Sequence, residues 1–564
     1  MINFFGKTFR TVFLFIVLFE LLSFLGYFYP MVNKAGFFII TAAVLALSLY
    51  KLEYGIYIAL AELFVGSKGY LFYFEQGGLA ISIRVALWLI VMSVWLGAKL
   101  RKKIAEKRGR ITQKDAEEKN FLRIPYFSYF FILFIFIGWG LINGILRGND
   151  LGNVFFDFNN WLYFALIFPI YNVIASPPAD EAGSKATKQS RLGGDISELN
   201  PPCPLPPAAG LKGVLMDIFQ IFTAAILWLC VKTFFLLFVF SHNIQSITYE
   251  LYRWTRVSGI GEVTQVADGF SRIFFQSHIF VLVGFFVFLV LLTIQKDVAH
   301  RPHPISLPAS LAGGLTKERG DFTLFSVVCF LLSVIIITFS RSFWAALIAG
   351  LLIYCLFFAF YKIGWRKFFI AKGVILVSFV LAIGIIFGVI KFPYPKPTAV
   401  FSTEFLSERA TAIYGEAGAS SRWALLPKLW AQIKKTPVLG QGFGATVTYK
   451  TSDPRVLESS PTGEYTTYAF EWGWLDIWLK LGVFGLLAYF ILAGKIIYDG
   501  LIKNSKLKIQ NDNKKFKIIL GFTIGLLVIF VVNIFSPYLN HPLGIGYLIL
   551  AAALIGANQS SPLA

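Results

Sequence analysis

The chain is poor in charged residues and in cysteine, and each shortage excludes a class of protein. Only 15% of its 564 residues are charged, 57% are hydrophobic, and the mean hydropathy is +0.68. A soluble globular domain carries about 25% charged residues, so this composition predicts a polytopic membrane protein. The four cysteines fall in apolar runs or, for Cys203, in a proline-rich loop. They predict neither a disulfide framework nor a metal site.

Fourteen apolar segments approach or reach the length that a bilayer-crossing helix needs. We therefore expect an all-α polytopic membrane protein with about 14 transmembrane helices, within a range of 12–14. The segments near 35–50 and 54–74 are the weakest, because they are short and Lys51 and Glu53 interrupt them. The predicted spans lie near 11–29, 35–50, 54–74, 79–98, 124–146, 158–176, 213–240, 273–295, 322–339, 342–361, 370–390, 473–498, 518–535 and 543–558.

The net charge of +20 could indicate a nucleic-acid partner, but the basic residues are distributed as in a membrane protein. Ten Lys and Arg lie in 99–123 and seven in 495–517, on one side of the predicted membrane. Cytoplasmic loops carry such an excess, so we expect membrane lipids and no nucleic acid as partners. The Pro/Gly/Ser-rich loop 177–212 belongs to the same side and is predicted to be disordered. The alternation places an 82-residue loop, 391–472, outside.

The predicted outer side retains several arginines, although outer loops are usually poor in them. Arg341 lies between uncharged runs of 19 and 20 residues, and therefore in a short outer turn. Arginine suits phosphate because its planar fork donates two parallel hydrogen bonds and stays charged. The alternative is that these arginines anchor helix ends to lipid headgroups or pair with acids. The set comprises Arg84, Arg147, Arg253, Arg256, Arg272, Arg341, Arg409 and Arg422.

Within the large loop, "SRWALLPKLWAQIKKTPVLGQGFG" (421–444) has the pattern of an amphipathic helix that ends before Pro437. Such a helix outside the membrane should lie on the interface or cover a cavity between spans. The glycines at 440, 442 and 444 resemble a phosphate loop superficially. They follow a helix and lack a Lys-Ser/Thr end, which argues against nucleotide binding. The predicted apolar face consists of Trp423, Leu426, Leu429, Trp430 and Ile433.

Three segments in order resemble the O-antigen ligase and O-antigen polymerase superfamily of membrane glycosyltransferases. They are "TFSRSFWAAL" (338–347), the helix segment just described, and "EWGWLDIWLKLGVFG" (471–485). A weaker likeness is "SRIFFQSHIF" (271–280). The resemblance covers about 322–498 and suggests three parts: N-terminal membrane helices 1–321, a ligase-like core 322–498, and C-terminal helices 499–564. It also implies the lipid-dependent (GT-C-like) glycosyltransferase fold and a bacterial plasma (inner) membrane.

The resemblance implies an inverting enzyme in which an acceptor hydroxyl displaces undecaprenyl pyrophosphate from a lipid-linked glycan on the outer face. Arg272 and Arg341 correspond to the family's pyrophosphate-binding arginines, and we add Arg256 and Arg422 as candidates. The acceptor is a lipid or a glycan. No cofactor or metal is expected, because the first outer loop, 30–35, lacks the paired acids of metal-dependent relatives.

The catalytic base is a departure from the family, which commonly places a histidine where the large loop re-enters the membrane. Glu471 occupies that position here, counted back from Gly482. A carboxylate can act as a general base, but Glu471 could instead cap the following helix. His242, His278 and His541 are the substitutes. Asp476 and Lys480, spaced i,i+4 in the same span, are expected to form a membrane-buried ion pair.

The superfamily motifs leave two functions open besides a ligase. A polymerase would use a second lipid-linked glycan as acceptor. A lipid-linked oligosaccharide flippase would also need a cationic cavity, but it has no use for a large outer loop with its own helix. Flippases tend to show two similar halves, and this sequence shows no internal repeat.

Overall fold

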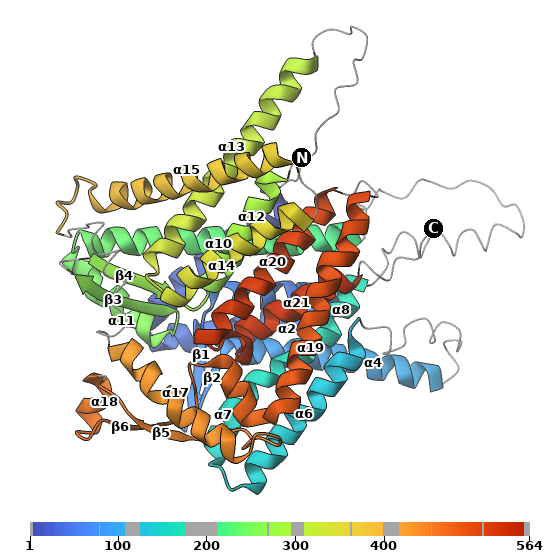
Figure 1. Cartoon of the computed structure of the whole chain (residues 1–564), viewed down its shortest axis with the longest axis vertical. Coiled ribbons are helices and arrows are strands. Elements are labelled where there is room, and N and C mark those ends of the chain that lie inside the picture. Colours follow the sequence, from blue (N-terminus) through green and yellow to red (C-terminus); the bar gives the residue numbers. More distant parts are fainter. Residues whose placement is uncertain are drawn as a thin grey trace, which may run out of the picture.

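The computed structural model describes residues 4–77, 79–107, 125–175, 211–267, 270–294, 309–360, 364–398, 417–452, 454–509 and 513–557, and these are mostly helical (Figure 1). Arg409, Cys203 and most of the loops 99–123 and 177–212 lie outside the described residues.

The N-terminal half contains helices of very different lengths. Two predicted spans do not form single helices of membrane-crossing length. The segment near 54–74 stops at Val65 because Ser67 and Gly69 adopt positive φ. The segment near 158–176 is broken close to Pro169, which fits only a first helical turn. The elements are α1 (Lys7–Phe28), α2 (Pro30–Tyr50), α3 (Leu52–Val65), α4 (Ile83–Lys107), α6 (Phe127–Leu146), α7 (Leu151–Trp161), η2 (Leu162–Leu166), α8 (Ile167–Ala175), α10 (Leu211–Ser241), α11 (Gln245–Val257) and α12 (His278–Thr293).

The C-terminal half follows the predicted spans closely and adds a helix outside them, at the expected place. The helix predicted within 421–444 ends at Lys435, before Pro437. The elements are α13 (Ala309–Ile337), α14 (Arg341–Phe360), α15 (Trp365–Ile390), α17 (Ala417–Lys435), α18 (Pro454–Ser459), α19 (Gly473–Ile509), α20 (Asn513–Phe535), η3 (Tyr538–Asn540) and α21 (Pro542–Ala557).

Within the described residues, three antiparallel hairpins interrupt the helices, so the expectation of an all-helical chain needs this correction. In the sequence, hydrophobic periodicity alone does not distinguish a short strand from the end of a neighbouring apolar helix. In the second hairpin Thr264 pairs with Arg272, which places Arg272 in mid-strand. The hairpins are β1 (Tyr73–Gln76) with β2 (Leu79–Ser82), β3 (Gly261–Ala267) with β4 (Phe270–Phe275), and β5 (Val447–Lys450) with β6 (Glu464–Thr467).

Burial separates a central layer of helices from a lipid-exposed one. All residues of α21 except Pro542, and nearly all of α12, are buried. By contrast, α1, α2 and α15 expose most of their apolar residues, as lipid-facing helices do. Among the described residues, α1, α2, α4, α6, α10, α15, α19 and α20 are long and apolar enough to cross a membrane, and α12, α13, α14 and α21 contain shorter apolar helices.

The hairpins β3–β4 and β5–β6 lie with α11 and α18 on the left side of the helix bundle in Figure 1, and β1–β2 lies nearer its centre. Ser67 contacts Ser277, and Tyr538 donates to the carbonyl of Gln276 there. The starts of α1 and α10, both predicted to lie at the cytoplasmic face, contact each other: Thr8 of α1 donates to Asp217 of α10. These contacts agree with the predicted alternation of the chain. Which face is cytoplasmic remains a prediction.

Candidate functional site

The turn between α13 and α14 carries the first candidate, Arg341. Residues 338–340 form the turn, and Arg341 is the first residue of α14, as the uncharged runs on either side predict. Phe339 adopts φ +47°, a conformation that is costly for a bulky side chain. Its ring is buried against Phe270 and Trp344, with ring centroids 5.1 and 5.7 Å away. Aromatic packing therefore holds the turn in one shape.

Arg272 reaches this turn from β4. Its Nε donates to the carbonyl of Thr338 at 2.7 Å, and its guanidinium lies 4.8 Å from the ring of Phe274. Within the described part of the chain, its two terminal nitrogens make no hydrogen bond and no ion pair. Burial lowers the pKa of Arg272, Glu262 opposes that shift and Arg422 adds to it. Because the ordinary pKa of arginine exceeds 12, the group stays a cation that can bind an anion.

Arg422 and Glu471 form an ion pair across the large loop. The Arg422 Nε donates to one carboxylate oxygen of Glu471, and its Nη2 lies 3.4 Å from the other. Both side chains are partly exposed, at 37% and 48%. Trp472 fixes the backbone between them by donating from Nε1 to the carbonyl of Arg422 at 3.0 Å. The two residues, 49 positions apart, are thus brought together as a pair.

The charge of Arg422 links the three arginines. It acts electrostatically on both Arg272 and Arg341. The structure therefore groups three of the four predicted pyrophosphate residues with the predicted base, Glu471. Arg256 is different: it is exposed in the last turn of α11, and its guanidinium lies 5.5 Å from the ring of Tyr252 on the same helix.

Hydroxyl groups line the same turn, and the sequence motifs did not single them out. The Ser340 and Ser342 hydroxyls are 3.0 Å apart, and Ser536 donates to Ser342 at 3.3 Å. Tyr538 packs near this turn, with its ring centroid 5.9 Å from that of Phe343. The signal available in the sequence was the Ser-Arg-Ser run itself, since hydroxyls next to an arginine suit phosphate oxygens.

Two of the three substitute bases are engaged in structural hydrogen bonds. His278 is fully buried, accepts from the backbone N–H of Phe275 at Nδ1 and meets the Thr233 hydroxyl at Nε2. His242 is 4% exposed, and its ring nitrogens bond to the carbonyls of Phe238 and Phe392. These contacts leave neither ring free to face an acceptor hydroxyl.

His541 is the remaining histidine and lies between η3 and α21. Burial, together with the nearby charges of Lys480 and Lys68, lowers its pKa to about 4. It is therefore neutral at neutral pH and able to accept a proton. Lys68, in the turn after α3, was not among the predicted site residues, because its short loop carries no motif.

Lys480, Asp157 and Asp476 form a cluster of buried charged side chains. Asp476 and Lys480 form the expected i,i+4 ion pair, with 2.5 Å between carboxylate and ammonium. Lys480 also donates to Asp157 of α7 at 2.8 Å, and Asn540 donates to Asp476 at 2.6 Å. Each charged side chain is at most 8% exposed. The Asp157 partner, 323 residues away, had no sequence signal beyond being an acid next to an apolar run.

The glycine segment after α17 binds backbone, not phosphate. Gly440, Gly442 and Gly444 all have positive φ, between +71° and +79°. A Cβ at Gly442 would lie 2.1 Å from the backbone nitrogen of Gly144 on α6. Only glycine permits this turn and this approach. The segment runs between α6, α7 and α19, as the bond from the Gly444 N–H to Asp157 at 3.0 Å shows.

A break in α19 makes room for that segment. Gly482 has φ +74°, so the helix is interrupted and carbonyls of the preceding turn lose their partners. The N–H groups of Gln441 and Gly442 bond to the carbonyls of Leu479 and Lys480 at 2.6 and 3.1 Å, and Val483 N–H bonds to Pro437 O at 3.0 Å. The membrane helix and the loop thus complete each other's hydrogen bonds.

The face of α17 differs from its prediction. Leu425, Leu429 and Ile433 are buried, whereas Trp423 and Trp430 are 47% and 39% exposed. Their rings lie against Trp472 and Trp478, with centroids 5.5 and 5.4 Å apart. Spacing alone assigned both tryptophans to the apolar face. Their position at its edge suits an indole that keeps one side in a polar interface.

Comparison with family models matches residues 325–490 to the O-antigen ligase family. The match runs from within α13, through the Arg341 turn and α17, to the part of α19 beyond its break. The chain carries an O-antigen ligase domain. This match agrees with the resemblance that the three sequence segments predict, and the apolar helices indicate a multi-pass membrane protein. Comparisons with curated proteins and with solved structures give no match.

Proposed function

We propose that this protein is a membrane glycosyltransferase that moves a glycan from undecaprenyl pyrophosphate to an acceptor hydroxyl. The supporting observation is the grouping of Arg272, Arg341 and Arg422 beside Glu471, all but Arg272 within the family-matched region or its loop. Arg272 carries the most weight, because its terminal nitrogens have no hydrogen-bond partner among the described residues. A cation without a carboxylate partner in a largely buried place is suited to an anionic ligand.

In this proposal the arginines stabilise the leaving group. Negative charge develops on the pyrophosphate as the bond to the anomeric carbon breaks. Fixed guanidinium groups that already point to that position lower the barrier without reorganising. The fixed shape of the turn around Phe339 and the bond from Arg272 to Thr338 supply that rigidity.

Glu471 is proposed to take the proton of the acceptor hydroxyl as it attacks. In the structure its carboxylate is paired with Arg422. A pyrophosphate that binds Arg422 would compete with Glu471 for the same guanidinium and so release the carboxylate. Donor binding and base activation would then be coupled. His541, which is neutral at neutral pH, is the alternative base.

The site is proposed to face the outside of a bacterial plasma membrane, and the reaction to be inverting and metal-independent with a GT-C-like fold. The positive-inside pattern supports this orientation, because the predicted topology puts the arginines opposite the loops richest in Lys and Arg. A lipid-linked glycan polymerase of the same superfamily would use the same donor site. It differs only in taking a second lipid-linked glycan as acceptor.

The deciding experiment uses the full-length protein in lipid nanodiscs with an undecaprenyl-pyrophosphate-linked oligosaccharide. Release of undecaprenyl pyrophosphate that depends on an added acceptor supports a transferase. In proteoliposomes, movement of the lipid-linked glycan across the bilayer without release would identify a flippase and refute the proposal. Offering a lipid acceptor or a second lipid-linked glycan separates ligase from polymerase.

A further inference from the structure

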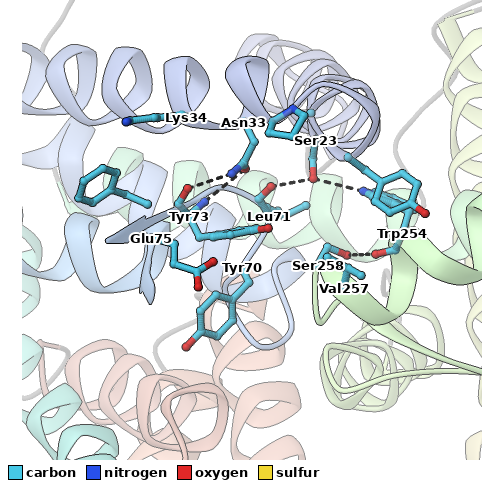
Figure 2. Close-up of a pocket in the computed structure, with 14 residues that line it drawn as sticks. Ser23, Asn33, Lys34, Tyr70, Leu71, Tyr73, Glu75, Trp254, Val257 and Ser258 are labelled. Atoms are coloured by element: carbon cyan, nitrogen blue, oxygen red, sulfur yellow. Dashed lines mark hydrogen bonds between the residues drawn. The ribbon is translucent and has the colours of Figure 1, made fainter. Parts of the chain in front are cut away.

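A cavity of about 350 Å³, lined by both polar and apolar groups, lies in the N-terminal half of the chain. It is enclosed by the ends of α1 and α2 around Pro30, the hairpin β1–β2 and the last turn of α11 (Figure 2). None of its lining residues belongs to the arginine group. Its volume is at the lower end of the range for small-molecule sites, which suits a mono- or disaccharide.

The walls of the cavity are fixed by hydrogen bonds between elements far apart in the chain. Asn33 of α2 donates to the carbonyl of Tyr73 at 2.9 Å and accepts from its N–H at 3.4 Å. Ser23 of α1 donates to the carbonyl of Leu71 at 2.7 Å, and Trp254 of α11 donates to Ser23 at 3.3 Å. Figure 2 shows these bonds joining the hairpin to the three helices. The cavity is therefore pre-formed.

Several polar groups of the lining are left for a ligand. Within the described residues, the hydroxyls of Tyr70 and Tyr73, the Lys34 ammonium and the Glu75 carboxylate make no hydrogen bond. The cation and the carboxylate balance each other. The cavity lining thus combines hydrogen-bond donors, hydrogen-bond acceptors and aromatic rings, and it carries no net charge from this pair.

This lining favours a neutral, polyhydroxylated ligand. A phosphate would be repelled by Glu75, and an acyl chain would offer no hydrogen bond to the half-buried hydroxyls of Tyr70 and Tyr73, which costs free energy. A sugar ring offers hydroxyls to the tyrosines and charged groups and apolar C–H faces to aromatic rings. The arginine group, by contrast, is built for an anion.

The cavity and the arginine group are physically connected. The turn just before Tyr70 contacts the turn that leads into β3, since Lys68 N–H bonds to the Gly259 carbonyl at 3.3 Å. Ser67 in the same turn contacts Ser277, two residues beyond the strand that carries Arg272. Both sites therefore lie on the same side of the bundle.

We propose that the cavity binds a mono- or disaccharide unit of a substrate glycan. The binding of a neutral sugar follows from the cavity alone. Its assignment to a substrate rests on the proposed transferase function. The sugar could belong to the lipid-linked donor or to a glycan acceptor, and the chemistry of recognition is the same for both.

The test of binding uses diazirine derivatives of glucose and N-acetylglucosamine with the full-length protein in nanodiscs. Photolabelling should fall on peptides containing 70–75 and 254–258, and unlabelled sugar should compete. Glu75→Gln and Tyr70→Phe should each reduce labelling about tenfold, the cost of a hydrogen bond to a charged or buried partner. Tyr29→Phe is the matched control, because Tyr29 is 60% exposed and does not line the cavity.

Labelling that spreads evenly over the outer surface, or capture of a diazirine fatty acid in place of the sugar, refutes the proposal. Arg341→Ala should label like wild type, which separates this site from the arginine group. In turnover, Tyr70→Phe should raise KM about tenfold for either donor or acceptor, leave kcat unchanged, and so identify the source of the sugar. Unchanged KM for both would refute the substrate role. Intact labelling by a wild-type protein that releases no undecaprenyl pyrophosphate would refute only the transferase.

Discussion

Two groups of oppositely charged residues differ in burial. Arg422 and Glu471 form a pair in which 37% and 48% of the side chains are exposed. Lys480 and its two carboxylates, from Asp157 and Asp476, are at most 8% exposed. The first group joins segments outside the spans, and the second joins helices within the bundle.

Burial decides what each group can do. An exposed ion pair contributes about 0–1 kcal/mol to stability, so a substrate can open it at small cost. Removing one partner from a buried pair costs about 3–5 kcal/mol, because a charge is left without compensation. The exposed pair is therefore available for catalysis, and the buried cluster holds α7, α19 and η3 in register.

The largest expected effect is on turnover at Arg341. Arg341→Ala should abolish release of undecaprenyl pyrophosphate, because the leaving group loses a cation. Arg341→Lys keeps the charge but loses the two-pronged hydrogen bonding, so turnover should still be impaired. Arg253→Ala, on exposed α11, is the control and should be active. If both Arg341 variants turn over donor at the wild-type rate, Arg341 only anchors the helix end.

Glu471→Gln should reduce transfer about 10²–10⁴-fold, since it keeps the shape and removes the base. Donor binding, measured with a non-hydrolysable lipid pyrophosphate, should persist. His541→Gln should stay active by the same assay. Full activity of the Glu471 variant together with loss of activity in the His541 variant would transfer the role of base to His541.

Lys480→Met should lower the free energy of unfolding by about 3–5 kcal/mol, because Asp157 and Asp476 would face each other in a buried site. The thermal midpoint of the detergent-solubilised protein, followed by fluorescence-detected gel filtration, measures it. Lys428→Met, on the exposed face of α17, should change stability by less than about 0.5 kcal/mol. Equal midpoints for the two variants would show that the cluster does not stabilise the fold.

The smallest effect is a pH dependence from His541. Its pKa is about 4 in the folded protein and about 6.5 when unfolded. Between these values the unfolded state binds more protons, so stability is complete above pH 6.5 and declines as pH falls toward 4. The thermal midpoint should drop between pH 7 and 5, and drop less in His541→Gln. An identical pH profile for both proteins would contradict the assignment.

The sequence was sufficient for features that local pattern determines. The turn at Arg341 follows from two long uncharged runs, the end of α17 from Pro437, and the Asp476–Lys480 pair from i,i+4 spacing. The arginines were selected because they break the usual scarcity of cations in outer loops. The family match confirms the superfamily that three short segments indicated.

What the sequence could not supply depends on tertiary contacts. The hairpins lie within or beside apolar runs, where a strand and a helix end look alike. The pairing of Arg422 with Glu471 and of Lys480 with Asp157 requires segments 49 and 323 residues apart to meet. The break at Gly482 was hidden because glycine is tolerated in helices, and its φ depends on the loop that fills the gap.

That break has a mechanical consequence for the helix that carries Arg422. Residues 436–444 are fixed to α19 and α6 by backbone bonds, so the C-terminal end of α17 is a fulcrum. Arg422 lies thirteen residues away, or about 20 Å along a helix rising about 1.5 Å per residue. A rotation of about 10° at the fulcrum would move Arg422 by about 3 Å, the length of one hydrogen bond. Opening of the bond from Trp472 to the Arg422 carbonyl would therefore let a small tilt at the clamped end of α17 displace the cation that Glu471 and the proposed pyrophosphate share.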